Sequence, residues 1–307
     1  MVGAGALGGY FGGRLLEAGR DVTFLVRARR AAELARTGLV VHSPFGGLTL
    51  TAPPHVLAQD IAGPFDVVIV GCKAYDLEQT MESFAPAVGR DTAILPLLNG
   101  TRHLDQLDAR FGHDRVLGGL CMISATLDGQ GAVAHLNDLH ALVLGERDGS
   151  RSARVAAIGV AFAGANFESR ISDEILQEMW EKWVFIASAA GITCLMRASI
   201  GDIVAAGGGP VVHSLLDQCA NIAARNGHAP RPQWLERARL ALTAPKSPIT
   251  ASMFKDMERG AAIEADHIVG DLLRRGGTEA AAAPSVLAIA YAHLRAYEAR
   301  RAGQARA

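Results

Sequence analysis

The first eight residues contain a glycine pattern that can hold a phosphate. They include Gly3-Ala4-Gly5-Ala6-Leu7-Gly8, which has the spacing G-x-G-x-x-G. In this pattern the first glycine makes a tight turn, the second lets the backbone approach a pyrophosphate, and the third lets a helix pack against a strand. Backbone amides at the start of that helix then hold the anion. We interpret residues 3–8 as a dinucleotide-binding turn.

The glycine pattern alone is weak evidence, because glycine makes up 34 of the 307 residues and the pattern can arise by chance. The residues that follow it support the interpretation. Residues 9–19 predict a short helix and residues 21–26 predict the next strand, which together complete most of a strand–helix–strand unit. The alternative is a glycine-rich turn without a ligand. Only Met1 and Val2 precede the first glycine, so either the first strand is unusually short or the sequence begins inside it.

Arginines after the second predicted strand bear on the choice of cofactor. An acid there would bind the ribose 2′-hydroxyl of NAD, whereas an arginine suits the 2′-phosphate of NADP. Residues 27–30 read RARR, and no acid occurs before Glu33. A guanidinium binds a phosphate through two hydrogen bonds, so we place Arg27 on the 2′-phosphate, assisted by Arg29 or Arg30, and expect NADP(H). The alternative is a solvated first turn of the next helix, although cations there oppose the helix dipole.

Two polar residues come directly after predicted parallel strands. Lys73 follows the apolar strand 65–70, and Asn99 follows the strand 92–98. Ligands of such sheets bind beyond the carboxyl ends of the strands, so both residues are candidates for the junction of cofactor and substrate. The alternatives are a lysine that ends its strand in water and an asparagine that only makes a turn before Gly100.

Lys182 is the candidate for proton transfer. It opens a helix that stays apolar for three to four turns, and an ammonium aimed at a carbonyl oxygen can polarise that oxygen and then donate a proton. The alternative is an exposed ion pair, because Glu178 lies four residues earlier in the favoured orientation.

A second group of polar residues falls in the segment 252–275, which we expect to form one helix. Steps of four residues through Gly260 would place Ser252, Asp256 and Glu264 along one row, with the glycine keeping the row open for a ligand. The alternative is an exposed charged face. Glu264 alone is followed by an apolar run, so it is the member of the group that borders the core.

Composition excludes several classes of function. The formal net charge is −1, the basic residues are scattered, and aromatic residues are 6% of the chain, which argues against a nucleic-acid partner. The four cysteines form no C-x-x-C pair and suit reduced thiols, so we expect a cytoplasmic protein. The sequence shows no signal peptide and no apolar stretch long enough to span a membrane. His135 and His140 do not have the spacing of zinc ligands, so no metal is expected.

The order of the predicted elements divides the chain into two domains. Strands and helices alternate up to about residue 168, and after Glu174 nearly every segment has helical periodicity. The sequence therefore predicts an α/β fold with a Rossmann-type dinucleotide-binding domain at 1–168 and an all-helical domain at 169–307 that carries substrate-binding and catalytic residues. The ligand cleft of the first domain is expected to face the second.

Several of these residues recur together in one known family. The matching pieces are residues 3–9, Arg27, Lys73-Ala74-Tyr75, Asn99-Gly100, Trp180-Glu181-Lys182, Ser252-Met253 with Asp256, and Glu264 with Asp266 and the helix to Arg275. In this order and at these spacings they resemble the ketopantoate reductases (2-dehydropantoate 2-reductases) over essentially the whole chain.

The resemblance implies an NADPH-dependent reduction of a 2-oxo acid to a 2-hydroxy acid, in the family's case 2-dehydropantoate to pantoate in pantothenate and coenzyme A biosynthesis. It implies that Lys182 is the general acid at the ketone oxygen and that Glu264 holds this lysine and the substrate hydroxyl. Lys73 and Asn99 would line the junction of cofactor and substrate, and Ser252 would bind the substrate carboxylate. A homodimer is the candidate oligomeric state.

The chain departs from the family pattern at two positions. Four and eight residues beyond the catalytic lysine the family commonly has asparagines, and here Ile186 and Ala190 stand there. This makes one wall of the pocket apolar, so the reaction type follows from the resemblance but ketopantoate as substrate does not. Two alternatives stay open, another two-domain hydroxyacid or opine-type dehydrogenase and a dinucleotide-binding sensor without catalysis.

Overall fold

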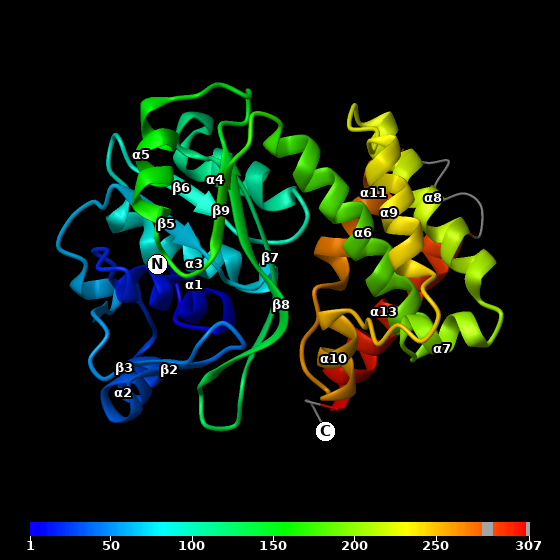
Figure 1. Cartoon of the computed structure of the whole chain (residues 1–307), viewed down its shortest axis with the longest axis horizontal. Coiled ribbons are helices and arrows are strands. Elements are labelled where there is room, and N and C mark those ends of the chain that lie inside the picture. The colour runs from blue at the N-terminus through cyan, green and yellow to red at the C-terminus, as the bar shows by residue number, and fades with distance from the viewer. Residues whose placement is uncertain (278–284, 305–307) are drawn as a thin grey trace. The chain divides into compact units, whose positions relative to one another are not determined.

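The computed structural model describes residues 1–277 and 285–304, which form two compact units (Figure 1). One unit holds residues 1–98 and 103–175, and the other holds residues 99–102 together with the described residues from 176 onward. All strands of the described chain belong to the first unit, and the second is helical. The predicted fold class, an α/β part followed by a helical part, is confirmed.

A parallel sheet forms the first layer of the α/β unit. Its strands are β1 (Phe24–Leu25), β4 (His55–Val56), β5 (Val67–Val70) and β6 (Ala93–Pro96). Val2 bridges Leu25 on one side and Val70 on the other, so the order is β4, β1, Val2, β5, β6. The N-terminal strand is thus reduced to this bridging residue. Most residues of β5 and β6 are buried, as is typical of parallel strands covered by helices.

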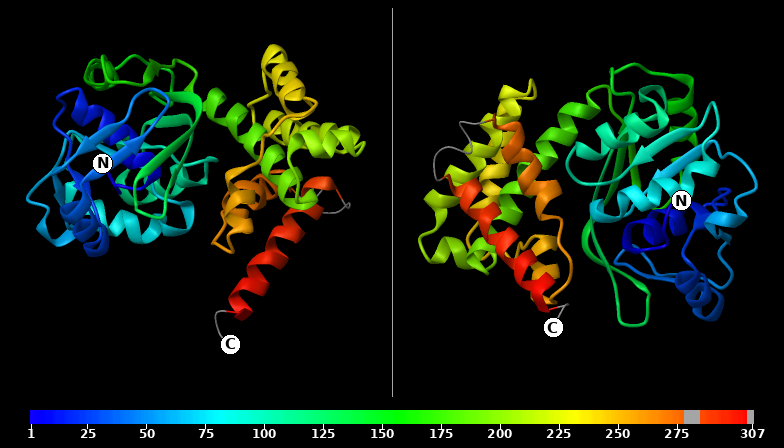
Figure 2. Two further views of the ribbon diagram at one scale, coloured as in Figure 1. Left: turned by 60° about the horizontal axis from the view of Figure 1, so that its bottom comes forward. Right: turned by 180° about the vertical axis from the view of Figure 1, so that it is seen from behind.

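Helices and a second sheet complete this unit. The helices are α1 (Ala6–Glu17), α2 (Ala28–Thr37), α3 (Leu77–Phe84), α4 (Arg102–Phe111) and α5 (Ala153–Phe162). The second sheet consists of β2 (Leu39–His42), β3 (Leu48–Leu50), β7 (Gly118–Leu127), β8 (Val133–Gly145) and β9 (Glu168–Ile171). β7 and β8 form a long antiparallel hairpin whose tip extends beyond the other strands (Figures 1 and 2). β9 pairs with β8, so this sheet crosses residue 168, where the sequence predicted the domain boundary.

The helical unit is built around α6. Its helices are α6 (Ile175–Met196), α7 (Ile200–Ala205), α8 (Gly209–Arg225), α9 (Pro232–Leu242), α10 (Ser252–Glu258), α11 (Asp271–Arg275) and α13 (Val286–Gln304). Trp183, Val184 and Ala187 of α6 have no exposed surface and lie in the core of this unit. The helix predicted over 284–301 corresponds to α13, with residue 284 outside the described residues. No helix in the described ranges is both long and apolar enough to cross a bilayer.

The single helix predicted over 252–275 is wrong. α10 ends at Glu258, Gly260 adopts a left-handed φ of +67°, and regular helical structure resumes only after residue 264. The amide of Gly260 donates to the carbonyl of Met257 and that of Ala261 to the carbonyl of Asp256, which is the hydrogen-bond pattern of a Schellman helix end. Gly260 therefore ends a helix, and the predicted row of polar residues does not form.

Candidate functional site

The glycine turn leaves open space on one side and is closed on the other. Gly3 has a left-handed φ of +85°, and its amide donates to the carbonyl of Leu25 (2.8 Å). A Cβ on Gly8 would overlap the carbonyl oxygen of Gly3, whereas a Cβ on Gly5 would meet no heavy atom within 4 Å. Helix α1 begins at Ala6, so its first-turn amides, including those of Ala6 and Leu7, have no acceptor within the helix. This geometry fits a pyrophosphate held in front of Gly5.

The three arginines after β1 have different surroundings. Arg27 is 67% exposed, and its guanidinium donates to Oε1 of Gln79 (3.0 Å). Arg30 is largely buried and donates to the carbonyl of Ala4 (3.0 Å), so it supports the glycine turn. Arg29 is 92% exposed, which agrees with the alternative that this arginine lies in a solvated first turn of the helix. Arg27, which directly follows the residue after β1, is thus exposed and hydrogen-bonded, whereas Arg29 extends into solvent.

The residues that follow β5 and β6 lie in different units. Lys73 is half-buried between β5 and the short 3-10 helix Ala74–Asp76 of the first unit. Asn99 belongs to the second unit, where its backbone carbonyl oxygen accepts a hydrogen bond from Nε2 of His267 (2.8 Å). Because a carbonyl can only accept, the neutral His267 ring carries its proton on Nε2.

His267 interacts with Glu264, the carboxylate predicted to hold the catalytic lysine. Burial lowers the pKa of His267, while the Glu264 carboxylate, the bond to Asn99 and Asp271 act in the opposite direction. The ring is three residues from Glu264 in the chain and interacts with its charge. The structure thus brings Asn99 and Glu264 into the neighbourhood of one histidine.

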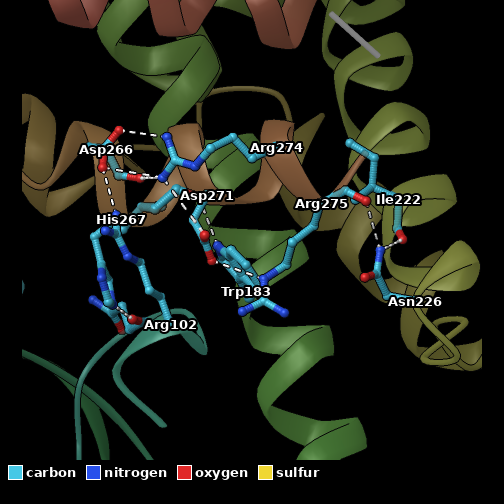
Figure 3. Close-up of polar contacts among 11 residues, drawn as sticks. Arg102, Trp183, Ile222, Asn226, Asp266, His267, Asp271, Arg274 and Arg275 are labelled. Atoms are coloured by element: carbon cyan, nitrogen blue, oxygen red, sulfur yellow. Dashed lines mark hydrogen bonds and ion pairs between the residues drawn. The ribbon is translucent and has the colours of Figure 1, made fainter. Parts of the chain in front are cut away.

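Asp266 holds the same segment through a network of hydrogen bonds (Figure 3). Its carboxylate accepts from Arg102 (2.8 Å), Arg274 (2.8 Å) and Tyr291 (2.7 Å). Burial alone would raise the pKa of Asp266, but the hydrogen bonds from the two arginines and the tyrosine hold that pKa well below its usual value. Arg102 is three residues after Asn99, so this network fixes the loop that carries Asn99.

Lys182 lies on the partly exposed side of α6. Its neighbours in the chain fix the rotation of the helix, since Glu181 is buried and accepts from Nε of Arg231 (2.8 Å), and Trp183 donates to the carbonyl of Ile268 (2.8 Å). The Lys182 side chain itself is partly exposed, between these two anchored neighbours.

The other predicted residues of the helical unit are less closely grouped. Ile186 is half-buried, one turn after Lys182, but Ala190 is 2% exposed and lies in the core. Both were expected on an open face, but Ala190 is in the core and Ile186, although half-buried, also packs against that core. Ser252 is exposed at the first position of α10, whose N-cap residue Ala251 donates its amide to Oγ1 of Thr193 on α6 (3.3 Å).

Family models match both parts of the chain. The model of ketopantoate reductase PanE/ApbA matches residues 1–149, and that of the ketopantoate reductase PanE/ApbA C-terminal domain matches residues 174–298. The chain belongs to the ketopantoate reductase family. The resemblance that the motifs indicated is thereby confirmed, and the chain is an oxidoreductase of a family whose members depend on NAD(P).

Individual relatives agree with this assignment. An uncharacterized oxidoreductase of Bacillus subtilis (strain 168), YkpB, is 41% identical over 97% of this chain and 98% of its own length. The structure of a 2-dehydropantoate 2-reductase from Geobacter metallireducens GS-15 covers 96% of this chain and 97% of its own, with 28% identity and a TM-score of 0.85. D-Mandelate dehydrogenase, solved with NADH and anilino(oxo)acetate, shares the fold at 20% identity (TM-score 0.84; 98% of this chain and 99% of its own).

Residues that contact the predicted site were missed by the sequence analysis. His267 and Arg102 carry no motif, and their partners are 168 and 164 residues away in the chain. The available signal was indirect, because a buried polar side chain needs a hydrogen-bond partner and His267 sits in an apolar run.

Proposed function

We propose that this ketopantoate reductase family member reduces a 2-oxo acid to a 2-hydroxy acid with NADPH, with 2-dehydropantoate in pantothenate biosynthesis as the first candidate substrate. The observation that carries the proposal is Lys182, a cationic side chain on the partly exposed side of α6 in a chain that belongs to the ketopantoate reductase family. The glycine turn supports dinucleotide binding, since it has room for a phosphate in front of Gly5.

In the proposed reaction, the glycine turn and Arg27 would hold NADPH, which would supply a hydride to C2 of the 2-oxo acid. The Lys182 ammonium polarises the ketone oxygen and then donates the proton that completes the hydroxyl group. Glu264 holds that ammonium and the new hydroxyl, and Ser252 binds the substrate carboxylate. Lys73 of the first unit and Asn99 of the second are proposed as further cofactor and substrate contacts, and His267 and Asp266 hold the segment that carries Asn99.

The preference for NADPH is proposed from Arg27. Arg27→Ala should raise the Kd of NADPH about ten- to hundredfold, the value of a charge-assisted hydrogen bond, and change the Kd of NADH little. Arg29→Ala is the matched control, because it removes the same charge from a side chain that is 92% exposed. Titration of each cofactor by protein fluorescence measures both constants. Equal affinity of the unaltered protein for NADPH and NADH would contradict the preference.

Substrate class is tested with a panel of 2-oxo acids and NADPH, following the nicotinamide absorbance. We expect turnover of ketopantoate and of aliphatic 2-oxo acids. A protein that binds NADPH but oxidises it with no member of the panel would support the sensor alternative. If NADPH is oxidised only when an amino acid is added together with a 2-oxo acid, the result would support an opine-type dehydrogenase.

The wall beside Lys182 is expected to weaken selection for the 4-hydroxyl of ketopantoate. Ile186 offers that hydroxyl no partner, and an unpaired buried hydroxyl costs about 1–3 kcal/mol, or roughly ten- to hundredfold in kcat/KM. Ile186→Asn should therefore raise the ratio of kcat/KM for ketopantoate over 3-methyl-2-oxobutanoate by about tenfold. A protein that already prefers ketopantoate by several orders of magnitude would show that other groups bind the hydroxyl.

Ala190 is unsuited to the same test. It is 2% exposed in the helical core, so Ala190→Asn would force a larger polar side chain into packed surroundings. A loss of activity in that variant would report on folding and not on specificity.

We also propose a cytoplasmic location and a homodimer. The four cysteines, all within the described ranges, form no disulfide, which suits a reducing compartment. The homodimer is carried over from the family resemblance, and light scattering on the purified protein measures it.

A further inference from the structure

Asp76 approaches the arginine that is proposed to read the cofactor phosphate. It ends the 3-10 helix Ala74–Asp76 and stands at the N-cap position of α3. An aspartate at this position commonly accepts a hydrogen bond from the first turn of its helix, but the Asp76 side chain makes no such bond. Its Oδ1 instead lies 3.6 Å from a terminal nitrogen of Arg27.

Gln79 contacts the same guanidinium from the first turn of α3. Its Oε1 accepts from the same nitrogen of Arg27 at 3.0 Å. Arg27 and Asp76 are 67% and 40% exposed, so their ion pair is in contact with water and can be exchanged for another partner at low cost. A 2′-phosphate that binds Arg27 must therefore compete with an acidic side chain already next to it.

The two cofactors would meet these groups differently. A 2′-phosphate carries a charge of about −2 near pH 7, so the Asp76 carboxylate repels it while Arg27 attracts it. The 2′-hydroxyl of NADH carries no charge and can donate a hydrogen bond to a carboxylate, as acidic residues near the ribose do in NAD-binding folds. In the sequence no acid directly follows β1, but the fold brings one to Arg27 from the segment after β5.

We infer that Asp76 is a cofactor-specificity residue that narrows the preference of this chain for NADPH over NADH, an inference that rests on the proposed function. Arg27 sets the direction of the preference and Asp76 limits its size. Both groups belong to the first unit, so the inference depends only on contacts within that unit.

The test compares cofactor binding in three proteins. Asp76→Asn keeps the shape of the side chain and its capacity to cap α3 but removes the charge. It should lower the Kd of NADPH relative to that of NADH about three- to tenfold, as expected for one screened charge a few ångströms from a phosphate. The shift should shrink at high salt. Glu78→Gln is the matched control, because it removes an equal charge from an exposed residue of the same helix turn.

Each result distinguishes this inference from the proposed function. If the unaltered protein binds neither NADPH nor NADH, the proposed function fails. If it binds them and Asp76→Asn leaves the ratio of the two Kd values unchanged, the inference about Asp76 fails while the proposed function stands. A shift of the same size in Glu78→Gln would also overturn it, since the effect would then come from net charge and not from the contact with Arg27. Measuring both cofactors on each variant makes loss of folding visible as a parallel loss of both affinities.

Discussion

Replacing Lys182 by alanine should lower kcat about 10²–10⁴-fold, the usual contribution of a positioned proton donor, and leave the Kd of NADPH nearly unchanged. Lys182 lies on the partly exposed side of α6. Its removal should therefore change the free energy of unfolding by less than about 0.5 kcal/mol, as for other surface substitutions. Stopped-flow or steady-state reduction of the best 2-oxo acid from the panel measures the effect.

Two further variants separate the possible roles of this charge. Lys182→Arg keeps a cation but cannot release a proton at neutral pH, so it should remain close to the alanine variant in kcat. Glu178→Gln should leave kcat within about threefold, because the proposed mechanism gives Glu178 no part. Turnover of Lys182→Ala at the unaltered rate would remove Lys182 from the mechanism, and rescue by arginine would show that charge alone is sufficient.

Sequence reasoning succeeded where the structure is determined by short segments. The glycine turn, the helix after it and the strands β5 and β6 follow from local spacing, and α6 follows from an apolar run of helical length. Lys182 could be singled out because its position in that helix is fixed by neighbours one to four residues away.

Residue spacing gave a wrong prediction where glycine can either lie inside a helix or end it. Gly260 was read as a small residue inside a helix, yet its left-handed φ ends the helix in a Schellman motif, and the row through Ser252 and Glu264 is lost. Ala190 has the helical spacing of an open face but lies where other elements pack on α6, which helical periodicity of one segment does not reveal.

Contacts between segments that are distant in the chain could not be predicted from the sequence. Arg27 and Asp76 are 49 residues apart, and the bond between His267 and Asn99 spans 168 residues. Both contacts involve a motif residue: the first places an acid next to the arginine proposed to bind the 2′-phosphate, and the second holds the backbone carbonyl of Asn99. The motifs therefore indicate which residues carry chemistry, and the fold determines the surroundings of those residues.

The two glycines at the start of α1 should respond to alanine in opposite ways. In Gly8→Ala the new Cβ would overlap the carbonyl oxygen of Gly3, which is backbone and cannot rotate away. The gain of about 1 kcal/mol in helix propensity does not offset this overlap, so we expect a net loss of about 2–3 kcal/mol in the free energy of unfolding. Urea denaturation measures this loss.

Gly5→Ala should leave the fold intact but weaken the binding of the cofactor. Gly5 has an ordinary φ of −80°, and a Cβ there would meet no heavy atom within 4 Å, so the free energy of unfolding should change by less than about 1 kcal/mol. The added methyl group occupies the space in which a pyrophosphate would approach the first-turn amides, and losing one such charge-assisted hydrogen bond should raise the Kd about ten- to hundredfold. The loss should be equal for NADPH and NADH, unlike that of Arg27→Ala, because both cofactors carry the pyrophosphate. A Gly5→Ala protein that binds both cofactors normally would show that the turn does not hold the phosphates, and a Gly8→Ala protein of unaltered stability would show that α1 can shift away from Gly3.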